Sequence, residues 1–315
     1  MLPKAVLAST DLLADAAARC AWVQWSEIGA TTLHAPKADE VIVDIEALLL
    51  GSLGLAARVP RLRTLATDWT LENSQLLSIA RLRALLAGPF ARSGVQIGEL
   101  AHVVATEGGD ARWRALVSGG PVHADHVDQA RSTPRKAMPP RWRGASTLLL
   151  QLRRGFGVGV KPDLIAILLG VRGAWIDAST LAELSGYSVA AVRRAADEMS
   201  NAGLIETSGG HSRAFRADLA GWKSLFASAE AAVWRRRADG FAFALRWLGE
   251  TRQHEGASRS ELALAIGFGV MMTDFWRLWL EAGVTQKPVS DDPAAAWASR
   301  HDAIVSLVHW FGATK

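Results

Sequence analysis

The sequence contains very little cysteine, and this scarcity excludes several classes of protein. Cys20 is the single cysteine among 315 residues, so no intramolecular disulfide can form and no zinc site can be built from several cysteines. No apolar run reaches the roughly 20 residues that span a bilayer, because charged residues interrupt the most apolar segments. Asp11 and Asp15 interrupt the apolar stretch that an N-terminal signal peptide would need. These absences predict a cytoplasmic protein with no membrane partner.

Familiar catalytic motifs are missing as well. The sequence has no Gly-x-Ser-x-Gly nucleophile motif and no His-Glu-x-x-His metal motif. The glycines of residues 153–163, RRGFGVGVKPD, match neither the Walker A spacing nor the Gly-x-Gly-x-x-Gly pattern of phosphate-binding loops. We therefore interpret this segment as a connection before a helix. Metal-binding side chains occur at His123, Asp125, His126 and Asp128, but without a further partner at a known spacing, which favours a solvated loop. The sequence therefore predicts no enzyme, no cofactor and no metal site.

The remaining composition is that of an ordinary folded protein, with 50% hydrophobic and 21% charged residues. A chain of this length is expected to form more than one module. Apolar residues at helical spacing predict a mainly α, multi-domain protein. Its expected parts are an N-terminal helical domain (1–118), a basic linker (119–144), a central domain (145–221) and a C-terminal helical domain (222–315).

Positive charge is concentrated just before the central domain. Eight basic and two acidic residues give residues 119–161 a net charge of +6, whereas the whole chain has +4. Four prolines and two glycines in residues 119–143, without apolar periodicity, predict a linker or a long surface loop.

The flanking regions allow more detailed predictions. Residues 74–89, SQLLSIARLRALLAGP, predict a helix that Ser74 caps and Gly88 ends, with Arg81 and Arg83 outside its apolar stripe.

Residues 222–250 predict one helix, on which the WRRR run at 234–237 is interpreted as a solvated face, the alternative being a phosphate or partner contact. Aromatic residues around Phe275 and Trp279 are interpreted as core packing, with a dimer interface or an apolar effector pocket as alternatives. Cys20 is interpreted as a small core residue.

The central segment, residues 178–210, reads ASTLAELSGYSVAAVRRAADEMSNAGLIETSGG. Asp177 or Ser179 predicts the start of a short helix, and Gly186 permits a tight turn. Ser188 predicts the N-cap of a second helix, which Gly203 ends in a left-handed conformation. The residues GLIET and RAFRAD, on either side of SGGHS, predict a β-hairpin that Phe215 seals. The order is helix, turn, helix, hairpin.

This pattern resembles the winged helix-turn-helix domain of bacterial transcription regulators of the ArsR and MarR type. The resemblance rests on TLAELSGYSVAAVRRAADEMSNAGLIE, with its Leu-Ala pair, glycine turn, Val-x-x-Val helix and Gly-Leu-Ile before the wing, and it covers about 60 residues. It implies a central winged helix with a small β wing, a function in transcriptional regulation by binding of double-stranded DNA, and a homodimer whose two copies contact paired half-sites.

The resemblance also implies which residues contact DNA. The exposed side of the second helix would enter the major groove with Ser188, Ala190, Ala191, Arg193, Arg194 and Asp197. Wing contacts are implied for His211, Arg213 and Arg216, and a phosphate contact for Tyr187. The basic stretch near the linker supplies further candidates for phosphate contacts, namely Arg131, Arg135, Lys136, Arg141, Arg143, Arg153 and Arg154.

Two observations keep an alternative open. Five basic and seven acidic residues give residues 162–221 a net charge of −2, whereas a DNA-binding surface presents positive charge. Winged helices also serve as protein interaction modules, so the chain is alternatively a non-catalytic adaptor with a protein partner. An uncovered, positive face around Arg193 and Arg194 would favour DNA, and a covered or acidic face would favour the adaptor. Converging carboxylates in a pocket of residues 1–118 would instead favour an enzyme.

Overall fold

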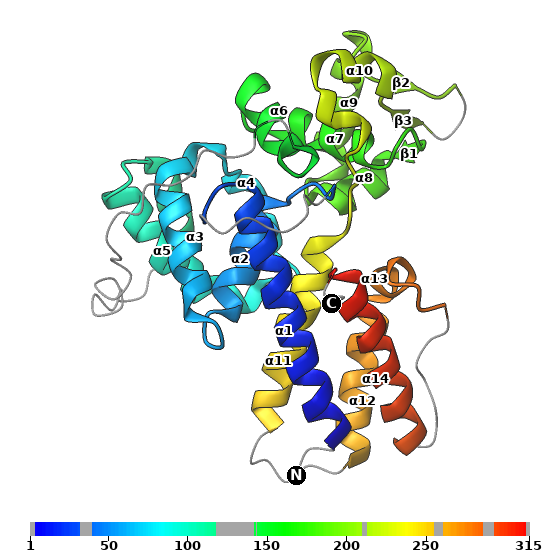
Figure 1. Ribbon diagram of the computed structural model, residues 1–315. Coiled ribbons are helices and arrows are strands. Elements are labelled where there is room, and N and C mark those ends of the chain that lie inside the picture. The colour runs from blue at the N-terminus through cyan, green and yellow to red at the C-terminus, as the bar shows by residue number, and fades with distance from the viewer. Residues whose placement is uncertain are drawn as a thin grey trace.

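The computed structural model describes residues 4–31, 40–117, 142, 144–209, 213–254, 261–285 and 293–312. In these ranges the protein is mainly helical, as the sequence predicts, and its strands form a small three-stranded sheet (Figure 1). None of the helices in the described ranges combines the length and apolar character needed to cross a membrane.

The N-terminal region consists of five helices. They are α1 (Lys4–Glu27), α2 (Ile45–Leu55), α3 (Pro60–Asn73), α4 (Ile79–Ala87) and α5 (Gly94–Thr106). Short 3-10 turns span Ser74–Leu76, Ala91–Ser93 and Ala111–Leu116. The predicted N-cap at Ser74 is wrong, because the Ser78 side chain accepts the hydrogen bond from the Arg81 backbone N–H and α4 starts one turn later. The predicted end at Gly88 is confirmed.

The C-terminal helices complete the core of the N-terminal ones. These are α11 (Arg237–His254), α12 (Glu261–Asp274), α13 (Trp276–Glu281) and α14 (Pro293–Trp310). In Figure 1, α1 runs between α11 and α14, although almost the whole chain separates α1 from α14 in sequence. Buried residues of both regions form one hydrophobic cluster, which includes Trp25, Leu48, Trp247 and Trp279. Helices α1–α5 and α11–α14, which lie in the segments 1–118 and 222–315 that the sequence suggested as two domains, therefore share one core.

Two glycines allow α2 and α11 to approach closely. A Cβ atom at Gly51 would lie 2.7 Å from the Phe241 ring, and one at Gly54 would lie 2.4 Å from the Leu245 side chain. Since real Cβ atoms do not come this close to another side chain, larger residues at these positions would push the two helices apart. The glycines thus help to fix the N-terminal region against the C-terminal one.

The central region has its own hydrophobic cluster. Its elements are α6 (Leu148–Phe156), α7 (Val160–Gly170), β1 (Ile176–Asp177), α8 (Ala178–Ser185), α9 (Val189–Asn201), β2 (Glu206–Thr207), β3 (Ala214–Arg216) and α10 (Leu219–Leu225), with 3-10 turns at Ala145–Thr147 and Ala227–Glu230. The strands are antiparallel in the order β1-β3-β2, with Phe215 of β3 opposite Ile176 and Thr207. Phe215 is buried, as predicted.

The chain between the central and C-terminal regions differs from its prediction. Residues 222–250 do not form one helix, because α10 ends at Leu225 and α11 starts only at Arg237. Between them Val233 forms a parallel β-bridge with Val41, so the WRRR run begins in extended chain. Arg237 is buried with its guanidinium carbon 4.6 Å from the Trp310 ring centroid. The interpretation of WRRR as a solvated helix face is therefore wrong.

The aromatic residues of the C-terminal region pack in the core, as the favoured interpretation predicts. The ring of Phe243 meets that of Trp279 edge to face at 4.7 Å, and the ring of Trp247 meets that of Phe268 at 4.4 Å. Cys20 is also buried, as expected for a core residue. The predicted linker lies almost wholly outside the described residues, and so does the loop from His123 to Asp128.

Candidate nucleic-acid interface

The helix α9 forms as its sequence dictates. The Ser188 hydroxyl accepts a hydrogen bond from the Ala191 N–H at 3.2 Å and caps the helix, and Gly203 follows it with φ of +72°. Val192, Ala196 and Met199 recur at helical spacing and are buried. This anchors one face of α9 in the central core and leaves the opposite face to solvent.

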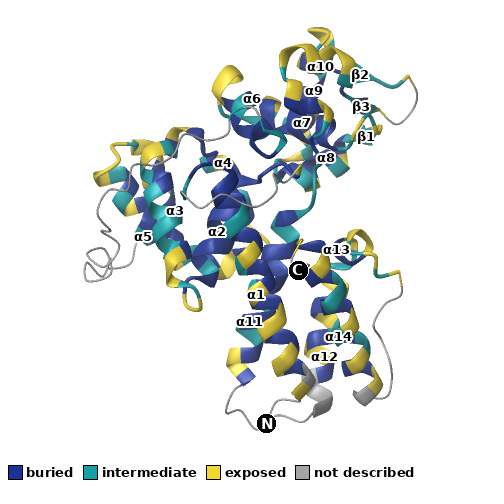
Figure 2. Cartoon of the chain, viewed as in Figure 1, coloured by how far each residue is buried: buried dark blue, intermediate teal, exposed yellow. Residues whose placement is uncertain are grey.

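The opposite face presents two exposed arginines. Arg193 and Arg194 are exposed, and within the described ranges neither forms an ion pair with a carboxylate. The nearby acids already have partners, because Asp197 lies 3.1 Å from Arg213 and Glu198 lies 2.7 Å from Lys161. Figure 2 shows the exposed residues of α9 and α10 at the end of the molecule far from the bundle of α1, α11, α12 and α14. Both arginines are therefore exposed and positively charged, and the pKa of the nearby Glu198 carboxylate is lowered mainly by Lys161 and to a smaller extent by Arg194.

The net negative charge of residues 162–221 does not contradict the positive charge of this face. Asp163 is buried beside Arg153, and Glu183 pairs with Arg236 and Arg277, all three arginines lying outside this segment. The carboxylates of Asp177 and Asp218 cap helices α8 and α10, and Glu206 pairs with Arg216. Counting charges along the sequence misses these pairings, so the net charge of −2 does not describe the surface around α9.

The residues predicted to form wing contacts are less available for DNA than the two arginines of α9. Arg216 lies 2.7 Å from Glu206 and stacks its guanidinium 4.6 Å from the Trp175 ring centroid. Arg213 is exposed, but its guanidinium pairs with Asp197 across to α9. His211 lies outside the described residues.

No family model, curated protein or solved structure matches this chain. Function must therefore be inferred from its own geometry.

Two predicted contact residues lie in a different place from the exposed face of α9. The Tyr187 hydroxyl donates a hydrogen bond to Asp163 Oδ2 at 3.0 Å and lies 3.0 Å from Ser78 Oγ. Arg153 is fully buried and donates hydrogen bonds to Asp163 and Glu46. Both side chains are thus held by interior groups, and the prediction that they contact phosphate is wrong for this structure.

Arg154, in contrast, is exposed, with its guanidinium 4.9 Å from the Trp142 ring centroid. The other linker candidates, Arg131, Arg135, Lys136, Arg141 and Arg143, lie outside the described residues.

Arg153 belongs to a buried charge network that joins the central and N-terminal regions. Its guanidinium contacts Glu46 of α2 at 2.6 Å and Asp163 of α7 at 2.8 Å. Arg81 of α4 lies 3.3 Å from Glu46 and 2.5 Å from Asp44, the N-cap of α2. All five side chains are at most 2% exposed. We call Asp44, Glu46, Arg81, Arg153 and Asp163 the buried charge network.

The pKa shifts in this network follow from burial and pairing. Burial raises the pKa of Asp44, and the Arg81 guanidinium offsets this effect only in part. Burial would also raise the pKa of Glu46, but Arg153 and Arg81 together hold it below its usual value. Burial, followed by the charge of Asp163, raises the pKa of the Tyr187 hydroxyl above its ordinary value. Glu46 is thus held ionised, and Tyr187 is held as a neutral donor.

The sequence reasoning missed this network although its acids were visible. Asp44 and Glu46 interrupt the apolar run VIVDIEALLL, and a buried acid inside such a run needs a basic partner. Periodicity placed Arg81 away from the apolar stripe, but it is 1% exposed. The carboxylates of Asp44 and Glu46 do converge here, but both are at most 2% exposed and paired with arginines, so the arrangement positions the central region. Among the residues with described structure, no cluster of histidine, cysteine and acids suits a metal ion.

Proposed function

We propose that this protein is a transcriptional regulator that binds duplex DNA through a winged helix formed by the central region. The observation that carries this proposal is the exposed face of α9, on which Arg193 and Arg194 form no ion pair within 4 Å in the described part of the chain. An arginine in the major groove can form two hydrogen bonds with one guanine, worth roughly 1–3 kcal/mol of discrimination. The proposed location is the cytoplasm, because a single cysteine gives no sign of an oxidising compartment.

The order of elements supports the same proposal. Helix α7, strand β1, helices α8 and α9 and strands β2 and β3 follow one another, and β3 lies between β1 and β2. A winged helix-turn-helix uses such an arrangement to hold its second helix against the first and to place a hairpin beside it. Here Gly186, with φ of +74°, forms the tight turn between α8 and α9.

Specificity in this proposal comes from α9, and additional phosphate contacts come from cations around it. Lys161 and Arg213 neutralise acids next to the arginines, and exposed Arg154 lies at the end of α6. A homodimer would place two such helices on paired half-sites and so strengthen weak single contacts. The basic residues between 131 and 143 would add phosphate contacts in the same proposal.

Selection of bound sequences from a pool of random duplexes tests this function directly. The expected result is enrichment of related sequences that contain guanines, arranged as an inverted repeat if two copies bind together. The variant Arg193→Ala/Arg194→Ala should lose the enrichment, whereas Arg19→Ala/Arg83→Ala, which removes two exposed arginines from α1 and α4, should keep it. Failure of the wild-type protein to retain any duplex at low salt would contradict DNA binding and favour a protein partner for the face of α9.

A further inference from the structure

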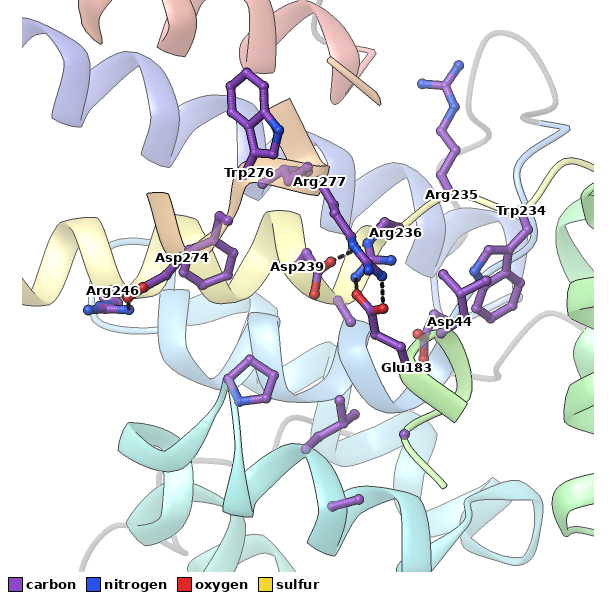
Figure 3. Close-up of a pocket in the computed structure, with 18 of the residues that line it drawn as sticks. Asp44, Glu183, Trp234, Arg235, Arg236, Asp239, Arg246, Asp274, Trp276 and Arg277 are labelled. Carbon is purple, nitrogen blue, oxygen red and sulfur yellow. Dashed lines mark hydrogen bonds and ion pairs between the residues drawn. The ribbon is translucent and has the colours of Figure 1, made fainter. Parts of the chain in front are cut away.

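A cleft of about 740 Å³ lies where the three regions of the protein meet. Its walls come from α4, from α8, from the chain leading into α11 and from the α12–α13 junction, and Figure 3 shows its side chains. A volume of this size suits a small organic molecule. The cleft also reaches Asp44, so it borders the buried charge network.

The cleft is unusually rich in arginine. Four arginines line it, namely Arg235, Arg236, Arg246 and Arg277. Four acids also line it, namely Asp44, Glu183, Asp239 and Asp274, and Asp274 pairs with Arg246 at 2.7 Å and Asp239 with Arg236 at 2.5 Å. The lining charges therefore balance, so an added anion has to take the place of a carboxylate, and arginine is well suited to bind the carboxylate or phosphate of a ligand through paired hydrogen bonds.

Glu183 now occupies the position that an external anion would take. It extends from α8 into the cleft, where its carboxylate pairs with both Arg236 and Arg277 (Figure 3). The side chain of Glu183 is 37% exposed and that of Arg277 is 58% exposed, so solvent and solutes reach this pair. Exposed ion pairs contribute little stability, so an anion in solution can compete with Glu183 for Arg277, whereas Arg236 is only 12% exposed and also pairs with Asp239.

Aromatic rings provide the apolar part of the same cleft. Trp234, Phe275 and Trp276 line it and are only half-buried. In Figure 3, Trp276 and Trp234 stand on different sides of the arginine group. The guanidinium carbon of Arg81 lies 5.9 Å from the centroid of the Trp234 ring, so one side of that ring is already in contact. A planar ring would pack against the exposed part of this aromatic surface.

We propose that the cleft binds a small organic anion that carries a planar ring, and that this anion displaces Glu183 from Arg236 and Arg277. The carboxylate or phosphate of the ligand accepts the guanidinium hydrogen bonds, and its ring packs against the aromatic wall.

Displacement of Glu183 would act on α8, which is the helix before α9. The Glu183 pairs tie α8 to Arg236, next to the start of α11, and to Arg277 of α13. A ligand that binds more tightly when these ion pairs are broken favours the state without them, and so shifts the position of α8 relative to the shared core. Coupling to DNA binding rests on the proposed function, whereas binding of the anion does not. The two can therefore fail separately.

Calorimetry in the absence of DNA tests the proposal on the full chain. Adenosine 5′-monophosphate and benzoate serve as ring-bearing anions, and inorganic phosphate and acetate serve as anions without a ring. Glu183→Ala removes the internal competitor and should bind at least one ring-bearing anion at least tenfold more tightly than wild type. Adding Arg277→Ala should abolish that gain. Whether the phosphate or the carboxylate binds identifies the acidic group of the ligand.

Glu250→Ala is the matched control, because it also frees an arginine, Arg92, but on a surface outside the cleft. This control should bind the probes as wild type does. The proposal would be overturned if Glu183→Ala gained no affinity for either ring-bearing anion, or if the ringless anions bound as tightly. A gain that survives the addition of Arg277→Ala would place the anion elsewhere and would also overturn it.

Discussion

Arg153 and Arg154 are neighbours in the sequence and lie in opposite environments. Arg153 is buried among Glu46 and Asp163, and Arg154 is exposed beside Trp142. Sequence reasoning treated both as candidates for phosphate contact, because partners more than 100 residues away, such as Glu46, cannot be seen from local spacing. The same limitation hid Arg81. Local patterns predict which residues are helical, and they do not reveal which charged side chains are buried with distant partners.

This contrast gives a direct prediction of stability. Arg153→Ala leaves the carboxylates of Glu46 and Asp163 buried without their shared partner, so the free energy of unfolding should fall by about 3–5 kcal/mol. Arg154→Ala, at the adjacent exposed position, should change it by no more than about 0.5 kcal/mol. Urea denaturation of both variants measures the difference. Equal effects of the two substitutions would show that Arg153 is not buried as described.

A substitution of Tyr187 distinguishes a role in the interior of the protein from a contact with DNA. Tyr187→Phe removes the hydroxyl that bonds Asp163 and Ser78, and a lost hydrogen bond to a charged group should lower the free energy of unfolding by about 1.5–3 kcal/mol. The affinity for DNA measured well below the unfolding temperature should stay within twofold of wild type. If affinity fell and stability did not, the hydroxyl would instead contact DNA.

Helix ends were the best-predicted features at the scale of the element. Asp177, Ser188 and Gly203 mark helix ends as their residue types predict, because capping depends on neighbours a few residues away. The hairpin with Phe215 inside also follows the predicted pattern. The helix predicted over 222–250 failed because the β-bridge between Val233 and Val41 holds the chain extended. Tertiary pairing overrides local helix propensity there.

The Asp177 cap predicts a specific dependence on pH. Hydrogen bonds from the Ser179 hydroxyl and then the Thr180 N–H lower the pKa of Asp177 to about 2 from an ordinary value of 3.8. Because the folded-state pKa is the lower one, its contribution to stability is present above about pH 4 and is lost as the pH falls toward 2. Asp177→Asn keeps a capping side chain that does not titrate. The difference in unfolding free energy between wild type and this variant should be constant from pH 7 to 5 and shrink below pH 4, and a difference independent of pH would contradict the assignment.

The shared core is a property of the whole molecule that the sequence did not reveal. Segments 1–118 and 222–315 each show helical periodicity, and nothing in periodicity states that α1 packs against α14. Since the apolar faces of α1 and α2 are buried against α11 and α14, residues 1–118 alone would expose them. We expect this fragment to show no cooperative thermal transition by circular dichroism. Mixing it with residues 222–315 should restore a transition, and cooperative unfolding of residues 1–118 alone would show that they form a separate domain.

The central claim for the whole molecule is that α9 binds DNA with Arg193 and Arg194. The most direct measurement is equilibrium binding to a labelled duplex across a salt series for wild type, Arg193→Ala/Arg194→Ala and the control Arg19→Ala/Arg83→Ala. Wild-type affinity should fall steeply as salt rises. The α9 variant should lose roughly 1–3 kcal/mol for each base contact removed, with the control unchanged. No wild-type binding at low salt, or equal affinity of the α9 variant, would contradict the assignment of α9 as the DNA-contacting helix.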